Sequence, residues 1–307
     1  PTATPTPTPT PTPADLQVTA MAAEVPNRAD GRKAKPKQGD RVLIRTTITN
    51  AGPGHADNSQ TEIRVDDELL GVVQTAAIPP GQAVEISIEW RTGQANGEHL
   101  ITATADIDDA VRETNESNNT GRLTVEVRGN QVHNGDFEQP NETEDGPAGW
   151  TATSTGAGTA SWNEEPAQPS GDEPGEPDEP AEPATNRSVS IRGTGRSVLL
   201  HGLPVWTSDA ISVSPGQMLT VSVDVRTQGM SSAPTIGLAY LGTTGKVLQT
   251  VSVLTVPLQT DGFTTIEQLA TVPLDATAVR IVLTGFSATD TKTRGTVTFD
   301  NVGLFAE

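Results

Sequence analysis

Apolar and polar residues alternate along most of the chain with a repeat of two, which is the pattern of a β-strand with one buried face. In RVLIRTTITN the residues Val42, Ile44, Thr46 and Ile48 fall on one face, and AVEISIEW and RLTVEV alternate in the same way. Segments rich in Gly, Pro and Asn separate these runs and are typical of turns. Residues 14–128 are therefore predicted to form an immunoglobulin-like sandwich of about seven strands.

A second block of alternating residues occupies positions 130–307. It contains MLTVSVDVRTQ in its middle and GTVTFDNVGLF at its end. Frequent Gly and Pro residues interrupt the runs, as expected for short strands joined by turns. The chain of 307 residues is long enough to bury two independent cores. We therefore predict an all-β protein of two sandwiches, with the boundary within a few residues of Gly129.

Two segments lack the strand pattern. Residues 1–13 alternate Thr and Pro almost without interruption, and because Pro fixes the backbone φ angle we expect an extended polyproline II arm or linker. Residues 163–185 are rich in Glu, Asp and Pro, a composition that cannot bury a core. We expect them to form a solvated loop inserted into the second sandwich.

Composition narrows the possible partners. The formal net charge of −19 disfavours nucleic acid and anionic membrane surfaces, since both attract clustered Lys and Arg. The sequence has no Cys, which excludes disulfides, Cys-bound zinc and thiol catalysis. No apolar run reaches the length of a membrane span, so no membrane insertion is expected. In the absence of a signal peptide, we expect the numbering to start at a processed end or inside a larger protein.

Catalytic motifs are not apparent. The four histidines, His55, His99, His133 and His201, show neither a GxSxG context nor metal-ligand spacing. Carboxylates are abundant, but most lie in segments of low complexity, whereas a glycosidase needs two held at a fixed separation. We therefore expect a protein that is not an enzyme.

The order of signals in residues 14–128 is specific. A strand ends in Asn50, Ala51 and Gly52, then IPPGQ leads into EISIEW, and GEHLITATADIDDAVRETNESNNT follows. Its most recognisable part is ETNESNNT at residues 113–120. This order resembles the CARDB family of bacterial surface domains. The resemblance implies an adhesion-related extracellular module without chemistry of its own.

The second block also carries recognisable segments. It opens with NGDFE at residues 134–138, has the V-x-P-G step that begins at Val213, and closes with FDNV at residues 299–302. Residues 130–306 thereby resemble the jelly-roll carbohydrate-binding modules that accompany bacterial polysaccharide hydrolases. The resemblance implies a jelly-roll β-sandwich. It does not by itself imply ligand binding, because a fold hosts many functions.

The same resemblance implies a structural calcium ion that ties the first strand to the last. The matching positions are Asp136, Glu138 and Asp300, whose carboxylates suit the oxygen ligands of calcium. The alternative is that Asp136 and Asp300 cap turns while Glu138 is solvated. A weaker candidate for a calcium site is an acidic cluster in the first sandwich. It comprises Asp106, Asp108, Asp109, Glu113 and Glu116. The alternative is that these residues form turns stabilised by local side-chain hydrogen bonds.

Glycan recognition commonly uses aromatic rings that stack on sugars. In the second sandwich Trp150 follows Gly149 at a position that we expect to be buried. Trp162, Trp206 and Tyr240 remain as candidate sugar platforms, and core packing is the alternative for each ring.

Two functions fit these observations. The first is a non-catalytic, secreted or cell-surface structural protein, such as the subunit of a bacterial surface filament, that contacts other copies of itself through the N-terminal arm. The second is a polysaccharide-binding accessory module of a secreted polysaccharide-degrading protein. In the first case we expect O-glycans on the arm. The acceptors would be Thr2, Thr4, Thr6, Thr8, Thr10 and Thr12.

Overall fold

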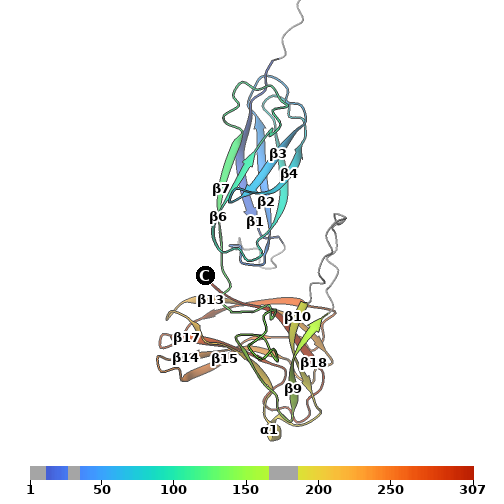
Figure 1. Cartoon of the computed structure of the whole chain (residues 1–307), viewed down its shortest axis with the longest axis vertical. Helices are drawn as coiled ribbons and strands as arrows, with labels where there is room; N and C mark the ends of the chain where they lie inside the picture. Colours follow the sequence, from blue (N-terminus) through green and yellow to red (C-terminus); the bar gives the residue numbers. More distant parts are fainter. Residues whose placement is uncertain (1–11, 27–34, 166–185) are drawn as a thin grey trace, which may run out of the picture. The chain divides into compact units, whose positions relative to one another are not determined.

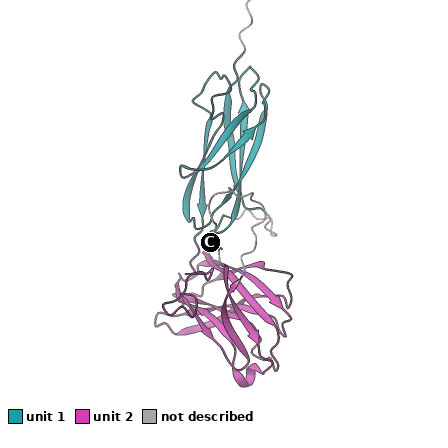
Figure 2. Cartoon of the chain, turned by 45° about the vertical axis from the view of Figure 1, so that its right-hand side comes forward, with its two compact units in different colours: residues 1–129 teal, residues 130–307 magenta. Residues whose placement is uncertain are grey.

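The computed structural model describes residues 12–26, 35–165 and 186–307. Contacts divide the chain into two compact units, Pro1–Gly129 and Asn130–Glu307, shown in separate colours in Figure 2. Both units are built of antiparallel strands, so the predicted all-β class is confirmed. Within the described ranges the one helix is α1 (Val198–His201), which is too short to cross a membrane.

Unit 1 is a sandwich of two sheets, with seven strands among its described residues, as predicted (Figure 1). One sheet has the order β1-β2-β5 and the other β4-β3-β6-β7. Their bounds are β1 (Leu16–Glu24), β2 (Arg41–Asn50), β3 (Ser59–Val65), β4 (Glu68–Thr75), β5 (Ala83–Arg91), β6 (Gly97–Thr104) and β7 (Thr120–Val127).

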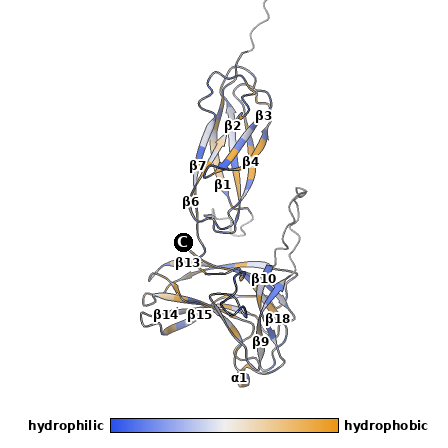
Figure 3. Ribbon diagram, viewed as in Figure 1, coloured by the Kyte–Doolittle hydropathy of each residue, from blue (hydrophilic) through white to orange (hydrophobic). Residues whose placement is uncertain are grey.

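The core of unit 1 follows from the alternation in its strands. On β2 the side chains of Val42, Ile44 and Ile48 are fully buried, and Thr46 shares their face at 1% exposure. Trp90 on β5 closes the same core. Figure 3 shows hydrophobic residues interspersed with hydrophilic ones along the strands, as a half-buried sheet requires.

Unit 2 is a larger sandwich. Its first sheet has the order β16-β13-β18-β10-β9, and its second has the order β15-β14-β17-β11-β8 with β12 added beside β17. The strands are β8 (Trp150–Thr153), β9 (Gly158–Glu165), β10 (Asn186–Gly193), β11 (Val205–Ser208), β12 (Ile211–Ser212), β13 (Met218–Gln228), β14 (Thr235–Leu241), β15 (Val247–Thr255), β16 (Thr264–Thr271), β17 (Ala278–Thr284) and β18 (Thr296–Ala306).

One boundary differs from the prediction. The acidic segment was expected to be a loop over residues 163–185, but β9 extends to Glu165 and pairs with β10 from Asn186. Strand pairing overrides the polar composition there because Asn163 and Glu164 each face a partner on β10. The remaining positions, 166–185, lie outside the described residues.

Candidate functional site

The NGDFE segment of unit 2 is organised by one buried asparagine. Asn134 is 7% exposed and has a φ of 51°, a left-handed conformation that Asn tolerates better than most residues. Its Nδ2 donates to the backbone oxygens of Gln139 and Ala148, both at 2.9 Å. Its Oδ1 accepts from the Gln139 amide at 2.9 Å. The side chain thus closes the loop that precedes β8.

The next residues join this loop to the last strand. The Val302 amide donates to the Gly135 oxygen at 2.7 Å, and a Cβ at Gly135 would lie 2.0 Å from the Val302 oxygen. Only glycine permits that approach. Phe137 is fully buried and packs on Trp150 with 5.0 Å between ring centroids. Residues 134–138 therefore join the start of unit 2 to its end, and we call them the fastener.

The expected calcium ligands lie around this fastener. The Glu138 Oε1 accepts from the Arg187 amide at 2.7 Å, and burial raises the pKa of Glu138. Asp136, on the same loop, is half-buried and adds to that rise through its charge. Asp300 on β18 is 3% exposed and accepts from Asn186 Nδ2 at 3.2 Å and from the Asn301 amide at 2.8 Å.

Asp300 carries little compensation for its charge. It lies opposite Asp224 in the β13–β18 pairing. Burial, followed by the charges of Asp224 and Glu138, raises the pKa of Asp300 to about 7 against its two hydrogen bonds. No ion pair to Asp300 is present among the described residues. Such a carboxylate suits a cation, which would favour its ionised form.

The described residues nevertheless hold no group of three or more His, Cys, Asp or Glu arranged around one metal position. Asp136, Glu138 and Asp300 are therefore not gathered around one position that could hold a metal ion. The calcium site stays a prediction.

Two of the three candidate sugar platforms are buried in the core of unit 2. Trp206 and Tyr240 are each 3% exposed. The Trp206 Nε1 donates to the Ser190 oxygen at 3.3 Å, and the Tyr240 hydroxyl donates to the Thr271 oxygen at 3.4 Å. Neither ring is available to stack on a sugar, which corrects the expectation for both residues. Trp150 is buried, at 7% exposure.

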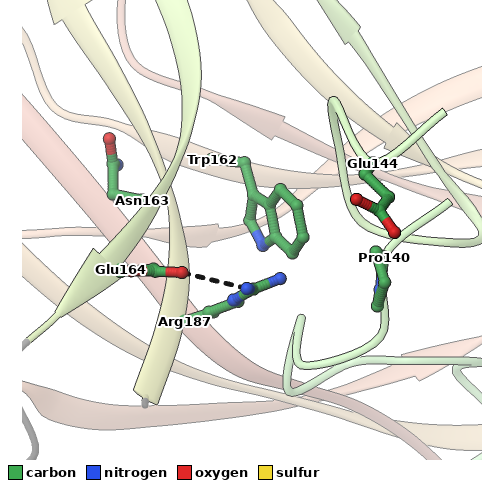
Figure 4. A pocket seen from close by; sticks show the side chains of 6 residues that line it. All are labelled: Pro140, Glu144, Trp162, Asn163, Glu164 and Arg187. Carbon is green, nitrogen blue, oxygen red and sulfur yellow. Dashed lines mark hydrogen bonds and ion pairs between the residues drawn. The ribbon is translucent and has the colours of Figure 1, made fainter.

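Trp162 lies at the surface, in a pocket of about 340 Å³ (Figure 4). Its Nε1 donates to the Phe137 oxygen at 2.9 Å, which fixes the ring at the edge of the core. The guanidinium of Arg187 lies 4.3 Å from the ring centroid and donates to Glu164 Oε1 at 2.9 Å. The pocket is lined by Pro140, Glu144, Trp162, Asn163, Glu164 and Arg187.

In unit 1 the ETNESNNT segment holds the start of β1. The Leu16 amide donates to Glu113 Oε2 in a short hydrogen bond, and Asn119 Nδ2 donates to Glu113 Oε1 at 2.9 Å. The neighbouring Asn118 Nδ2 donates to Asp15 Oδ1 at 2.9 Å. Burial raises the pKa of Glu113 to about 7, although both hydrogen bonds oppose the rise.

The chain just before β1 is held by backbone bonds on two sides. On one side the amides of Gly54 and Ala51 donate to the oxygens of residues 13 and 15 at 2.9 and 2.7 Å. On the other side the Ala14 amide donates to the Arg112 oxygen at 3.0 Å, and the Thr114 amide donates to the Ala14 oxygen at 2.8 Å. We call this arrangement of residues 12–16 between residues 50–54 and 112–119 the clasp. Sequence reasoning named its segments but did not predict that they converge.

Of the five acidic residues in the weaker calcium candidate of unit 1, Glu113 and Glu116 lie in the clasp. Asp106 accepts from the amides of Ala110 and Val111 at 3.1 and 2.9 Å, so it stabilises a turn. Asp108 and Asp109 are exposed. The Glu116 Oε1 accepts from the Glu113 amide at 3.2 Å. Glu113 and Glu116 therefore belong to the clasp, and Asp106 adds to the raised pKa of Glu113 through its charge.

The other predicted residues show no catalytic grouping in the described ranges. His99 Nδ1 contacts Asp66 Oδ2 at 2.5 Å, and its ring packs on Trp90. His55 lies 3.7 Å from Asp57 at the surface. Of the six threonines predicted to carry glycans, Thr12 is exposed and the other five lie outside the described residues.

Comparison with known families bears out the predicted resemblance. Residues 14–122, most of unit 1, match the CARDB family model. No curated protein matches the chain.

Solved structures with a similar arrangement include CARDB domains and carbohydrate-binding β-sandwiches. A Pyrococcus furiosus CARDB domain in complex with di-metal ions is 19% identical over 37% of this chain and 88% of its own, with a TM-score of 0.32. A xylan-binding domain from Paenibacillus barcinonensis is 12% identical over 56% of this chain and 90% of its own, with a TM-score of 0.33. Carbohydrate-binding modules of the β-sandwich superfamily are 11% identical over 94% of this chain and 98% of their own, with a TM-score of 0.41.

Proposed function

Starting from a first unit that matches the CARDB family over residues 14–122, we propose that the chain is a non-catalytic extracellular structural protein. Its task is to hold a Pro-Thr arm on a folded surface module. The observation that carries this proposal is the clasp, which secures the chain where the arm meets β1.

The clasp suits a connection that bears load. Backbone bonds from two separate segments reach residues 13–15, and side-chain bonds from Glu113 and Asn118 add to them. A pull on the arm would strain several of these bonds together, so one bond could not open by itself. Ala14 and Glu113 also form an isolated β-bridge of the parallel type. A flexible tail would not require such a fixed exit.

The assembly part of the proposal concerns the arm. Residues 1–11 of one copy bind a second copy as a polyproline II segment, and the glycosylated Thr side chains face away from the contact. A segment that is already extended loses less conformational entropy on docking than a Gly-Ser tail does. Copies joined head to tail through unlike surfaces form an open fibre.

Deletion of residues 1–11 tests this part and leaves the clasp intact. Negative-stain microscopy and sedimentation of the purified native protein should show fibres or oligomers, and the deletion variant should be monomeric. A variant with a Gly-Ser segment of equal length is the matched control and should assemble poorly. If the deletion variant assembles as well as the parent, or the parent is itself a monomer, the arm is only a linker.

A second candidate function is polysaccharide binding at the Trp162 pocket. The pocket supports it because an indole ring lies beside a guanidinium, two carboxylates and an amide. These groups offer both a stacking surface and hydrogen-bond partners for sugar hydroxyls. Arg187 already covers part of the ring, so a sugar would have to bind beside it or displace it.

Affinity electrophoresis against a panel of polysaccharides tests this function. Trp162→Ala should abolish the retardation that the parent shows. Phe263→Ala is the matched control, since Phe263 also lies under an arginine, Arg226, but outside the pocket. Equal retardation of Trp162→Ala and the parent, or no retardation of the parent by any polysaccharide, would refute binding at this pocket.

We also propose that calcium binds at Asp136, Glu138 and Asp300 and stabilises unit 2 by mass action. Its support is the buried, weakly compensated Asp300 carboxylate. Asp300→Ala should remove the loss of melting temperature that a chelator causes in unit 2. Identical melting of the parent with and without chelator would contradict the site.

A further inference from the structure

Two neighbouring amide oxygens in the clasp have no hydrogen-bond partner in the described part of the chain. Asn119 is 7% exposed; its Nδ2 donates to Glu113, but its Oδ1 is buried and accepts nothing. Asn118 repeats the arrangement, because its Nδ2 donates to Asp15 while its Oδ1 is buried without a partner. Two adjacent cases indicate a partner that binds oxygen.

The surrounding side chains are acidic. Glu113 lies between the Leu16 amide and Asn119, Glu116 contacts the Glu113 amide, and Asp106 is 6% exposed. Within the described ranges, none of these three carboxylates forms an ion pair. A water molecule could satisfy the amide oxygens but would not offset this charge.

The ligand types identify the class of cation. Three or more carboxylates, histidines or cysteines around one metal position are absent from the described residues. A site for zinc would need such a group, whereas calcium accepts amide and backbone oxygens beside a single carboxylate. Both available oxygen types, carboxylate and amide, are hard ligands.

We propose that unit 1 binds a calcium-type divalent cation in the clasp, with Glu113 and the Oδ1 atoms of Asn118 and Asn119 as ligands. Binding links β7 and the segment before it to the residues that begin β1, because Glu113 also holds the Leu16 amide. The stability of the clasp, and with it the attachment of the arm to unit 1, then depends on the bound cation. This site goes beyond the proposed function and does not require the chain to assemble or to bind polysaccharide.

Calorimetric titration of the chelator-treated full chain with calcium chloride tests the site. Asn119→Ala and Glu113→Gln should each bind one calcium ion fewer than the parent. Glu98→Gln is the matched control, since it removes one charge from an exposed position of unit 1, and it should bind as the parent does. Asp300→Ala separates the sites, because it removes only a calcium ion bound in unit 2. If Asn119→Ala and Glu113→Gln bind as many ions as the parent, the proposal is wrong.

Asn119→Asp distinguishes a ligand from a residue that only supports the fold. The new carboxylate faces Glu113, so unit 1 should melt several degrees lower in chelator. With calcium chloride the added oxygen ligand should restore the melting temperature to at least that of the parent. A loss of melting temperature that is equal with and without calcium would overturn the cation site. Scanning calorimetry of the full chain provides this measurement.

Discussion

The two units use their signature segments differently. In unit 1 ETNESNNT holds an incoming chain: Glu113 accepts from the Leu16 amide, Asn118 donates to the Asp15 side chain, and the Thr114 amide donates to the Ala14 oxygen. In unit 2 NGDFE holds the last strand of its own sandwich through the bond from the Val302 amide to the Gly135 oxygen, while Asn134 closes the loop and Phe137 packs on Trp150. The clasp of unit 1 is polar and lies where the arm enters. The fastener of unit 2 is anchored in the core, so breaking its contacts would open unit 2 itself.

An acid with a raised pKa lies in the clasp of unit 1, where Glu113 is half-buried, and beside NGDFE in unit 2, where Asp300 is buried. Burial is the first cause that raises the pKa of Glu113 in unit 1 and of Asp300 in unit 2, each to about 7. In both cases a backbone amide and an Asn side chain donate to the carboxylate. Both acids lie at joints between segments far apart in sequence. The two carboxyl groups with a pKa of about 7 therefore lie where segments distant in sequence meet, and not beside the surface rings.

The largest expected effect comes from adding a methyl group to one glycine of the clasp and to one glycine of the fastener. In Gly135→Ala the new Cβ would lie 2.0 Å from the Val302 oxygen, and β18 cannot move away, so unit 2 should lose about 3 kcal/mol or more of stability. In Gly54→Ala the Cβ would lie 1.9 Å from the oxygen of the exposed Thr12. That residue can shift, so the loss should be about 1–3 kcal/mol.

Urea unfolding of the two variants measures this difference. Gly262→Ala is the control, since its Cβ would meet nothing within 4 Å. Equal losses of unfolding free energy in Gly135→Ala and Gly54→Ala would show that the clasp and the fastener do not differ in rigidity.

A smaller effect is expected from pH. Glu113 and Asp300 have folded-state pKa values of about 7, above the value of about 4 for unfolded carboxyls. The folded chain then binds more protons than the unfolded chain between these values, so stability falls as pH rises from 5 to 7 and levels off above 7. In chelator, both units should melt higher at pH 5 than at pH 8.

Single variants assign the pH dependence to each unit. Asp300→Asn should flatten the profile of unit 2, with a residual slope from Glu138, whose pKa burial also raises. Glu113→Gln should flatten the profile of unit 1. Scanning calorimetry at several pH values checks both, and an unchanged slope in either variant would rule out that acid as the cause.

The smallest expected effect concerns the surface of unit 2. Arg187→Gln removes the cation–π contact with Trp162 and the ion pair with Glu164, both at the edge of the sandwich. The loss should be about 0.5–1 kcal/mol. A loss above 2 kcal/mol in urea unfolding would mean that the pocket is part of the core rather than a surface feature.

The alternation of residues was sufficient to predict the sandwiches because burial of one strand face is a local property. Val42, Ile44 and Ile48 lie in the core as their spacing indicates. The end of β9 was missed because the pairing of Glu164 with Arg187 joins positions on either side of the acidic segment, and composition alone does not report it.

The candidate site was harder to predict. An aromatic residue on a strand can face the core or the solvent, and this choice depends on the strand's neighbours. The sequence therefore leaves Trp206 and Tyr240 as candidate sugar platforms with core packing as the alternative, and the structure buries both. The clasp was missed for a similar reason. Its partners Leu16 and Glu113 are brought together only by the order of the strands. A dense run of Asn and acidic residues next to a strand was the available signal.

The clasp fixes the chain at the point where the arm meets unit 1. Native-state hydrogen exchange measured by NMR at the amides of Ala14, Leu16, Ala51, Gly54 and Thr114 tests it most directly, since each of these amides donates within the clasp. Exchange at these amides should be as slow as that of amides paired between β2 and β5, and it should be faster in Gly54→Ala. Exchange in the parent as fast as that of unprotected turn amides would contradict it.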